Sequence, residues 1–448
     1  MDYASFKAEV IARAQALGIA EYELYYHTVE NITVSAFGHG LDQFSAATEG
    51  GICFRCVVNG KMGYAATEEL SPEQAHSIVE RAVDNASVLE ADEPVFLVSP
   101  GQSYTPTGRD VKPMPETKQL IDKVLQTQEA LYATHPSITD GSTTRGIAQH
   151  SRIAIYNPKG LDLSTENAIT ALIVGAVVAE GEEKSNDYQI KVADLEAMDT
   201  AALCQKVTEG ALAKLGGEPA PTGVYPVVFH PEAMSDLLST FSDVFSSENA
   251  QKGLSRLADM EGKPVASAAV TIVDDPFHPE NPMPMPFDSE GSPTRKKNLV
   301  EKGTLNTLLY NLKTAALAGK ETTGNAAKAN YDSPVAILPF TMYLAPGEFT
   351  EEQLLQQAGT GVYIHSLAGL HAGANSITGD FSLQSEGYLI ENGKKTTHVK
   401  GFTVAGNFYQ LLKDITAVAD NLQLPAPTGT TAFGSPSVLV QNLSVAGK

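Results

Sequence analysis

The segment Gly359–Asn407 constrains the fold of this chain most, because strand-like runs alternate there with glycine-rich turns. The apolar run 361–367 enters a loop of Gly, Ala and Asn that carries His371 and closes at residues 378–380. Strand-like sequence then resumes and reaches a hairpin signal at residues 391–393. Glycine lets the backbone approach another group closely, and ordered loops often carry function. The segment therefore predicts a β-rich unit with a site at its loop.

The composition is that of a globular protein with two or three domains. The chain has 448 residues, of which 42% are hydrophobic and 19% charged. Three cysteines in this length do not indicate a disulfide framework. The longest nearly apolar run, residues 168–179, is shorter than the roughly 20 residues that span a bilayer. We recognise no signal peptide, and we expect a cytoplasmic protein without a membrane span.

The charge balance argues against direct binding to nucleic acid. The chain has 31 basic and 53 acidic residues, a net charge of -22, which repels phosphate backbones. Its best basic cluster, Arg295-Lys296-Lys297, is short and is typical of a solvated loop.

The periodicity predicts an α+β protein in three parts. Residues 1–95 are predicted to form an N-terminal α/β sandwich-like unit, and residues 110–216 a mixed middle segment. Residues 222–448 are predicted to form a β-rich C-terminal domain, barrel- or sheet-like and largely antiparallel. In the first unit, predicted strands cover residues 21–29, 31–37, 41–47 and 52–58, with a hairpin at Asn59-Gly60 and a helix capped by Ser71.

Two short motifs are better explained by structure than by chemistry. Cys53 and Cys56 have the spacing of a redox or metal motif, but they lie in a predicted strand, where residues three apart face opposite sides. His230 and Glu232 flank a proline, and this pattern predicts the first turn of a helix more than an acid/base pair.

Other polar residues have both a structural and a chemical interpretation. Asp288 and Glu290 follow a proline-rich loop and could form an acid/base pair or a cation site, or simply a turn. His365, His371 and Asp380 could supply metal ligands only if the loop folds back. We find no GxSxG elbow, P-loop or dinucleotide fingerprint.

Taken together, these pieces resemble the TldD/PmbA family of peptidase-complex subunits, also described as modulators of DNA gyrase. The resemblance covers nearly the whole chain and is clearest in the last domain. Its motifs are Phe287-Asp288-Ser289-Glu290-Gly291 with Thr294, Thr323-Gly324-Asn325-Ala326, Gly359-Thr360-Gly361-Val362, Ile377-Thr378-Gly379-Asp380-Phe381-Ser382, Gly387-Tyr388-Leu389-Ile390-Glu391-Asn392-Gly393 and Val404-Ala405-Gly406-Asn407, with a looser match from Gly50 to Ser71.

The resemblance implies two kinds of subunit, and this chain is similar to the non-catalytic PmbA/TldE kind. The catalytic kind carries His-Glu-x-x-x-His on the first helix of the last domain and a cysteine near the C-terminus. Here those helix positions hold Leu238, Ser239 and Asp243, no histidine occurs in residues 231–277, and no cysteine occurs in 429–434. We therefore expect no catalytic residue and no metal in this chain, and zinc in a partner subunit.

The resemblance further implies a cytoplasmic dimeric complex with a TldD-like zinc-bearing subunit that processes unfolded peptides. A strand edge can hold such a peptide by main-chain hydrogen bonds. The predicted peptide-binding residues are Gly361, Tyr363, His365, His371, Asn375, Asp380, Asp288 and Glu290. Two alternatives stay open: a self-sufficient metallopeptidase using His365, His371 and Asp380, with Glu290 as a further ligand, and a regulatory protein that binds DNA gyrase.

Overall fold

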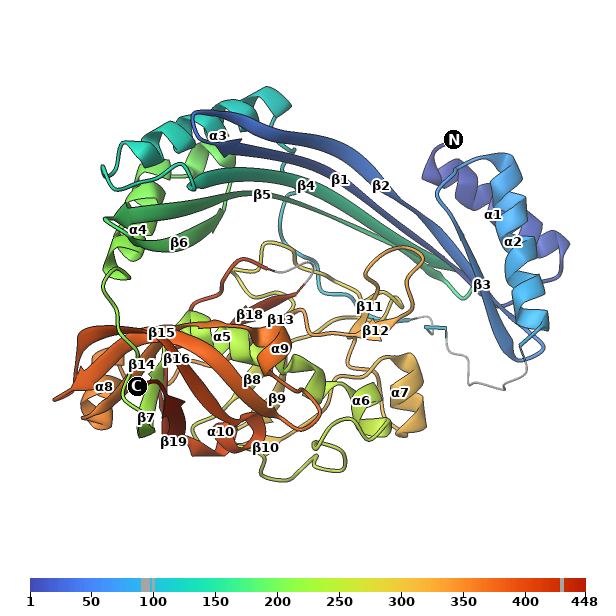
Figure 1. The fold of residues 1–448 in the computed structure, drawn as a ribbon. Helices are drawn as coiled ribbons and strands as arrows, with labels where there is room; N and C mark the ends of the chain where they lie inside the picture. Colours follow the sequence, from blue (N-terminus) through green and yellow to red (C-terminus); the bar gives the residue numbers. More distant parts are fainter. Residues whose placement is uncertain (90–96, 99–100, 428–430) are drawn as a thin grey trace.

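A long antiparallel sheet arches over the C-terminal part of the chain in the computed structural model, which describes residues 1–89, 97–98, 101–427 and 431–448 (Figure 1). The end of the predicted N-terminal unit and part of residues 429–434 lie outside these ranges. Six strands form this arched sheet in the order β3-β2-β1-β4-β5-β6. They are β1 (Tyr22–Phe37), β2 (Gly40–Val58), β3 (Lys61–Thr67), β4 (Thr143–Asn157), β5 (Leu161–Glu180) and β6 (Glu183–Val192).

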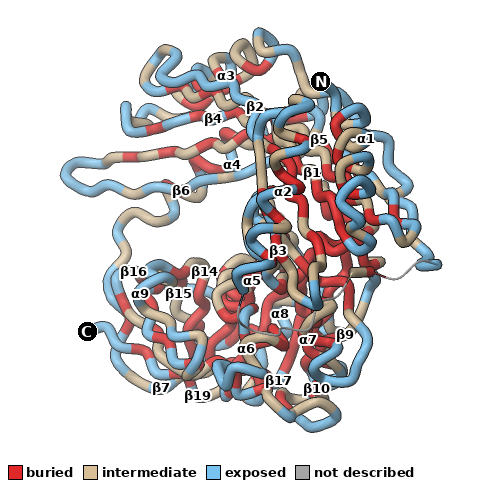
Figure 2. Tube along the Cα trace, turned by 90° about the vertical axis from the view of Figure 1, so that its right-hand side faces the viewer, coloured by how far each residue is buried: buried red, intermediate tan, exposed pale blue. Residues whose placement is uncertain are grey.

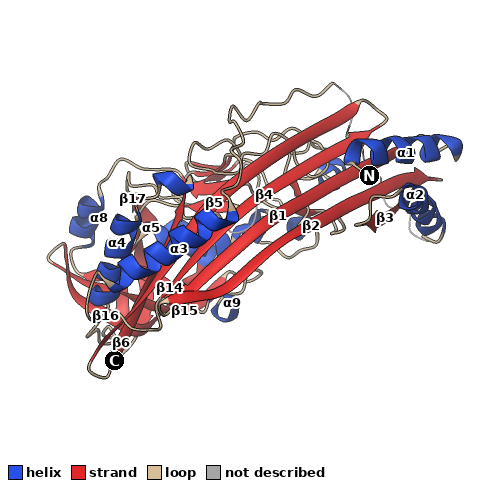
Figure 3. Cartoon of the chain, turned by 90° about the horizontal axis from the view of Figure 1, so that it is seen from above, coloured by secondary structure: helices blue, strands red, loops and turns tan. Residues whose placement is uncertain are grey.

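The arched sheet combines strands from the predicted N-terminal unit and from the predicted middle segment, because β1 pairs with both β2 and β4. Four helices lie on it, one pair near each end (Figure 3). They are α1 (Tyr3–Ala16), α2 (Pro72–Ser87), α3 (Thr117–Tyr132) and α4 (Thr200–Ala213), with the short 3-10 helix η1 (Leu195–Ala197) before α4.

The predicted breaks within β1 and β2 are wrong, since these strands run without interruption for 16 and 19 residues. The alternation of apolar residues fades in mid-strand because the helices cover only the ends of the sheet. Glu30 and Asn31 in the middle of β1 are exposed, whereas Val34 is buried again further along. The predicted strands therefore ended at this uncovered stretch, although the backbone pairing continues through it.

Local signals in the same region are confirmed. Asn59 and Gly60 both have positive φ, 50° and 77°, as a two-residue hairpin requires. Ser71 caps α2 by accepting a hydrogen bond from the Gln74 N–H, at 3.3 Å, with Pro72 in the first turn.

The C-terminal part contains a sheet that closes into a barrel. Its order is β16-β15-β14-β7-β19-β17, and β16 also pairs with β19, which closes a ring of five strands. Only the β14–β7 pair in this sheet is parallel within the described residues. The strands are β7 (Gly223–Phe229), β14 (Gly361–Ala368), β15 (Asp380–Glu391), β16 (Lys394–Asn407), β17 (Ile415–Val418) and β19 (Val438–Ala446). The predicted β-rich, largely antiparallel domain is confirmed.

A second, five-stranded sheet and a short pair complete this part. The sheet has the order β10-β9-β8-β13-β18, and β11 pairs with β12. The remaining strands are β8 (Ile272–Asp274), β9 (Lys297–Glu301), β10 (Thr304–Leu305), β11 (Ala326–Ala327), β12 (Ala336–Ile337), β13 (Thr341–Leu344) and β18 (Ala432–Gly434). The helices are α5 (Pro231–Thr240), η2 (Ser242–Phe245), α6 (Ser247–Gln251), α7 (Leu312–Leu317), α8 (Glu351–Ala358), α9 (Leu370–Gly373) and α10 (Phe408–Asp414).

The largest apolar core lies inside the C-terminal part, and buried residues also fill the end of the arched sheet that rests on it (Figure 2). That contact is made by a mixed cluster of apolar side chains. The sheet contributes Tyr25, Cys53, Ile153, Ile155 and Leu161, and the C-terminal part contributes Met285, Phe287 and Phe340. Among the described residues, no helix is long and apolar enough to cross a membrane.

Candidate functional site

A β-bulge in β14 directs His365 toward the start of α5. Ile364 pairs with Gly387 and Ser366 pairs with Glu386, so His365 is the extra residue between the two pairs. Bulges reorient a side chain in this way, often next to functional sites. The ring of His365 lies 4.5 Å from that of His230, measured between centroids. Two histidines that are far apart in the sequence therefore lie next to each other under the arched sheet.

His230 has the structural role that the sequence predicts. Its Nδ1 accepts a hydrogen bond from the Glu232 N–H at 3.2 Å, which caps α5. Burial, and next the nearby charge of His365, lower the pKa of His230 to about 3. Burial also lowers the pKa of His365. Near neutral pH this pair is uncharged and offers aromatic faces and nitrogen acceptors.

Two carboxylates follow on the same face of α5. Tyr188 of β6 donates a hydrogen bond from its hydroxyl to Glu232 Oε1, at 3.5 Å. Burial, and then Asp187, raise the pKa of Glu232. Burial, and then Glu232, raise the pKa of Asp236 to about 6. The sequence did not indicate Asp236. Burial, and then Glu232 and Asp236, raise the pKa of Tyr188 on the distant strand β6.

Two of the predicted peptide-binding residues lie in the core of β14. A Cβ atom on Gly361 would lie 2.3 Å from the Pro226 carbonyl oxygen, so the parallel pairing with β7 requires glycine there. Tyr363 is 1% exposed and donates a hydrogen bond to Glu351 Oε2 at 3.1 Å. Burial raises the pKa of Tyr363. Both residues support the strand from inside.

The glycine-rich loop after β14 is held by its own side chains. Asn375 Oδ1 accepts hydrogen bonds from the N–H groups of Ile377 and Thr378, at 3.0 and 3.1 Å. Asp380 Oδ1 accepts one from Asn407 Nδ2 at 2.8 Å, and this bond lowers the pKa of Asp380. His371 is exposed on α9.

These loop residues do not assemble a metal site with His365. Throughout the described ranges, no three His, Cys, Asp or Glu side chains are grouped so that they could hold a metal ion. The ligand set of the self-sufficient metallopeptidase, His365, His371 and Asp380, is therefore not brought together.

Asp288 forms the predicted turn, but in a deeply buried position. Its Oδ1 accepts hydrogen bonds from the N–H groups of Glu290 and Ser292, both at 2.9 Å, and its Oδ2 accepts one from Ala326 at 3.0 Å. Burial, and next the carboxylate of Glu290, raise the pKa of Asp288. The hydrogen bonds join the 287–291 motif to the 323–326 motif.

Glu290 belongs to a buried ion cluster between the arched sheet and the C-terminal part. Arg55 binds Glu23 through two hydrogen bonds, at 2.7 and 2.9 Å, and its guanidinium also lies 3.9 Å from Glu290 Oε1. Glu290 Oε2 accepts a further bond from the Leu312 N–H at 2.8 Å. These groups bind one another, and they link the arched sheet to the C-terminal part.

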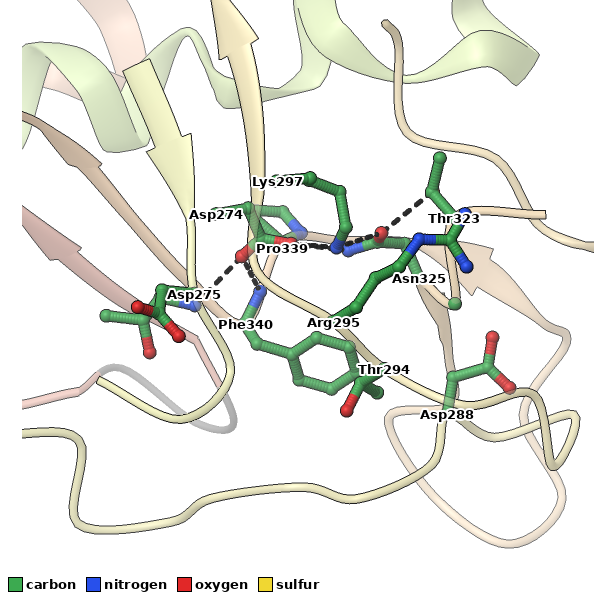
Figure 4. A network of polar contacts seen from close by, with 12 residues as sticks. Asp274, Asp275, Asp288, Thr294, Arg295, Lys297, Thr323, Asn325, Pro339 and Phe340 are labelled. Carbon is green, nitrogen blue, oxygen red and sulfur yellow. Dashed lines mark hydrogen bonds and ion pairs between the residues drawn. The ribbon is translucent and has the colours of Figure 1, made fainter. Parts of the chain in front are cut away.

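A second buried network explains the Thr323-Gly324-Asn325 motif (Figure 4). Asp274, which is 0% exposed, accepts hydrogen bonds from Lys297 Nζ at 2.9 Å and from Asn325 Nδ2 at 2.8 Å. The N–H groups of Phe340 and Thr341 also donate to it, at 2.8 and 3.1 Å. The motif thus ties β8, β9 and the start of β13 together.

The residues of α5 and η2 do not fit a zinc ion. Zinc in peptidases is bound by His, Cys or carboxylate ligands that converge on one point. α5 contains no histidine or cysteine. In the register that the resemblance implies, Leu238 is 1% exposed within the apolar core and Ser239 is a hydroxyl residue. Asp243 is a carboxylate in the next turn, where burial raises its pKa.

The groups described for the region under the arched sheet are mainly hydrogen-bond acceptors. They are uncharged imidazoles, carboxylates of raised pKa and strand backbone. Such groups accept hydrogen bonds from the main chain and from cationic side chains of an extended ligand.

Comparison with known families gives two matches within one family. Residues 222–447 match the model described as the PmbA/TldA metallopeptidase C-terminal domain. Residues 22–86 match the model described as PmbA/TldA metallopeptidase domain 1. Together they cover more than half of the chain.

Individual relatives match over almost their whole length. A protein of Haemophilus influenzae named metalloprotease PmbA homolog is 24% identical, with 99% of this chain and 95% of that protein aligned. A crystal structure from Thermotoga maritima, described as a modulator of a DNA gyrase, is 30% identical with a TM-score of 0.87, over 99% of this chain and 100% of that one. The structure of TldE from Thermococcus kodakarensis is 23% identical with a TM-score of 0.85, over 98% and 100%, and shares the fold.

Proposed function

Because the chain belongs to the PmbA/TldD metallopeptidase family, we propose that it is a non-catalytic subunit that pairs with a zinc-bearing, TldD-like subunit in a peptide-processing complex. The observation that carries this proposal is the composition of α5 and η2. α5, the first helix of the last domain, contains no histidine, and none occurs in residues 231–277. In the register that the resemblance implies, the motif positions hold Leu238, Ser239 and Asp243.

In this proposal the substrate is an unfolded peptide, and this chain helps to hold it. The bulged part of β14 with His365, the α9 loop with His371 and Asn375, and the neighbouring Asp380 form the contact surface. The acids of α5 add acceptors beside it. Asp288 and Glu290 lie instead at the junction with the arched sheet, where their oxygens are engaged, and we do not include them in this surface.

The complex is proposed to act in the cytoplasm. All three cysteines, Cys53, Cys56 and Cys204, are free and buried. Free thiols of this kind are typical of a reducing compartment.

Metal analysis of the purified chain, alone and together with a zinc-bearing sibling chain, tests the proposal. The chain alone should contain no stoichiometric zinc and should not cleave unfolded casein. The pair should contain zinc and should cleave unfolded casein. Stoichiometric zinc with peptidase activity in the chain alone would contradict the proposal.

A pull-down from the native host separates this proposal from gyrase regulation. The zinc-bearing sibling should be recovered with the tagged chain. Recovery of gyrase without that sibling would favour the regulatory role that the description of the Thermotoga maritima protein suggests.

A further inference from the structure

Half of β5 has an unpaired edge. β5 runs from Leu161 to Glu180, but β6 pairs only with residues 171–180. On its other side β4 pairs with residues 161–175. Within the described chain, no strand lies beside residues 161–170 on the β6 side. Unpaired edges are available for pairing with an added strand.

The hydrogen-bonding direction of this edge can be read from Thr170. Its carbonyl oxygen accepts a bond from the Ala193 N–H at 3.1 Å, so it points away from β4. Strand residues two apart point their backbone groups the same way, so Ala168 and Glu166 also face away from β4. In the described part of the chain, no hydrogen bond engages the backbone N–H or C=O of these two residues on that side.

This edge forms one wall of a groove of about 380 Å³. Five consecutive strand residues, 166–170, line it, which indicates that the strand presents its edge to the space. The opposite wall includes residues 107–113 together with Pro282 and Pro284, and Val192 lies at the end where β6 stops. Pro113, Pro282 and Pro284 lack an N–H, so these three lining residues cannot donate to the carbonyl oxygens of β5.

The opposite wall is anchored at several points. Tyr104 donates a hydrogen bond from its hydroxyl to the Gly291 carbonyl oxygen at 2.8 Å. Arg109 donates to the carbonyl oxygens of Pro279 and Asn281, and Lys112 forms an ion pair with Asp194. The groove is therefore bounded by structure on both sides.

We propose that this groove binds an extended segment of an unfolded peptide, which continues the arched sheet beside β5 and in line with β6. The proposal rests on the proposed function only in taking a peptide as the ligand, and it does not depend on the zinc-bearing partner. Recognition is through the four backbone groups of Glu166 and Ala168. Those groups are the same for every sequence, so binding tolerates many side chains.

Side chains around the groove limit its preference to neutral and basic segments. The carboxylate of Glu166 lies between two basic side chains. Its Oε2 is 3.4 Å from His150 Nε2, and its Oε1 is 3.4 Å from Arg152 Nε. Asp110, Asp194 and Glu280 also line the groove, and Arg109 and Lys112 are already engaged. An acidic segment would meet these carboxylates, whereas Ala168 and Pro284 accept apolar side chains.

Residue-resolved hydrogen exchange on the full chain tests the proposal directly. The probe is a fluorescein-labelled ten-residue peptide of alternating Val and Thr with a lysine at each end. In the free chain the amides of Glu166 and Ala168 should exchange rapidly, and those of Asn167 and Ile169, which face β4, slowly. The peptide should slow exchange at Glu166 and Ala168 at least about tenfold, the size expected for one hydrogen bond of roughly 1.4 kcal/mol. Protection only elsewhere, for example in β14, or no protection at all, would overturn the proposal.

Two further comparisons identify the backbone as the recognised feature. The same peptide with methylated backbone nitrogens should bind at least about tenfold more weakly in fluorescence polarisation. Ala168→Pro should weaken binding of the unmodified peptide similarly, because it removes a groove-facing N–H and no bond to β4, whereas Ala168→Val should retain it. Unchanged binding by Ala168→Pro of native melting temperature contradicts the proposal. If that variant does not fold, exchange in the wild-type chain decides. If neither hydrogen exchange nor the binding comparisons detect the peptide at the groove while a zinc-bearing sibling still co-purifies, binding at the groove is contradicted. The proposed function would be unaffected by that result.

Discussion

At the scale of single residues, the buried pair of His230 and His365 makes stability depend on pH. The folded pKa of His230 lies near 3, below that of the unfolded chain. Its contribution is therefore present above about pH 6.5 and is lost as the pH falls toward 3. His230→Asn keeps a side chain that caps helices well and removes the titration. When the pH is lowered from 7.5 to 5, the free energy of unfolding should decrease in both proteins. We expect this decrease to be about 1–2 kcal/mol smaller for the variant than for wild type.

Urea unfolding at the two pH values measures this difference. His371→Asn, which makes the same change at an exposed position, is the matched control and should follow wild type. A His230→Asn variant as acid-sensitive as wild type would show that the pair does not stay neutral in the folded chain.

The network around Asp274 gives a second prediction for a single side chain. Asn325 donates to Asp274 and to the Leu338 carbonyl oxygen, and it accepts from Lys297 at 2.9 Å. Asn325→Ala leaves buried charged groups short of partners and should cost about 2–4 kcal/mol of unfolding free energy in urea. Asn306→Ala, at an exposed asparagine bonded to Glu301, should cost no more than about 0.5 kcal/mol. Equal costs for the two variants would refute the structural role of the motif.

At the scale of elements, the pairing of β14 with β15 fixes where His365 points. A Cβ on Gly387 would lie 1.8 Å from the Tyr363 carbonyl oxygen, opposite the bulge. Gly387→Ala must therefore separate the strands, and we expect a loss of about 3 kcal/mol or more. Gly401, in the bulge of β16, has φ +68° but open space, so Gly401→Ala should cost only about 1–2 kcal/mol. Melting temperatures of the two variants rank these costs, and the reverse order would contradict the packing account.

Elements defined by neighbouring residues could be predicted from the sequence, and contacts between distant elements could not. The Ser71 cap and the Asn59-Gly60 hairpin depend on a few adjacent residues, so their signals are local. The bulge that joins His365 to His230 depends on the register of β14 against β15, which no single segment encodes. Asp236 was not predicted, since its raised pKa comes from burial and from Glu232, and burial in the folded chain is not visible in the local sequence.

At the scale of the whole molecule, the arched sheet is attached to the C-terminal part in two different ways. One end rests on the apolar cluster that includes Tyr25 and Phe287. The other end, at β6 and the end of α4, is held by polar contacts. Lys400 Nζ lies 3.5 Å from Glu183 Oε1 and 3.4 Å from the Lys214 carbonyl oxygen, and Tyr188 contacts Glu232 at 3.5 Å. Because polar contacts are weaker in water than a buried apolar cluster, the polar end is the one expected to open.

Salt should therefore loosen one end of the arched sheet and leave the other in place. Exposed ion pairs are screened as the Debye length falls to about 3 Å in 1 M salt, whereas apolar contacts persist. Between 0.01 and 1 M NaCl we expect hydrogen exchange in β6 to accelerate about threefold or more, with little change at Tyr22–His27 of β1. Lys400→Gln, which removes the ion pair, should exchange quickly in β6 even at low salt and respond less to added salt. A parallel response of β6 and β1 would mean that both ends are attached by the same kind of contact, and that the polar end has no special freedom to open.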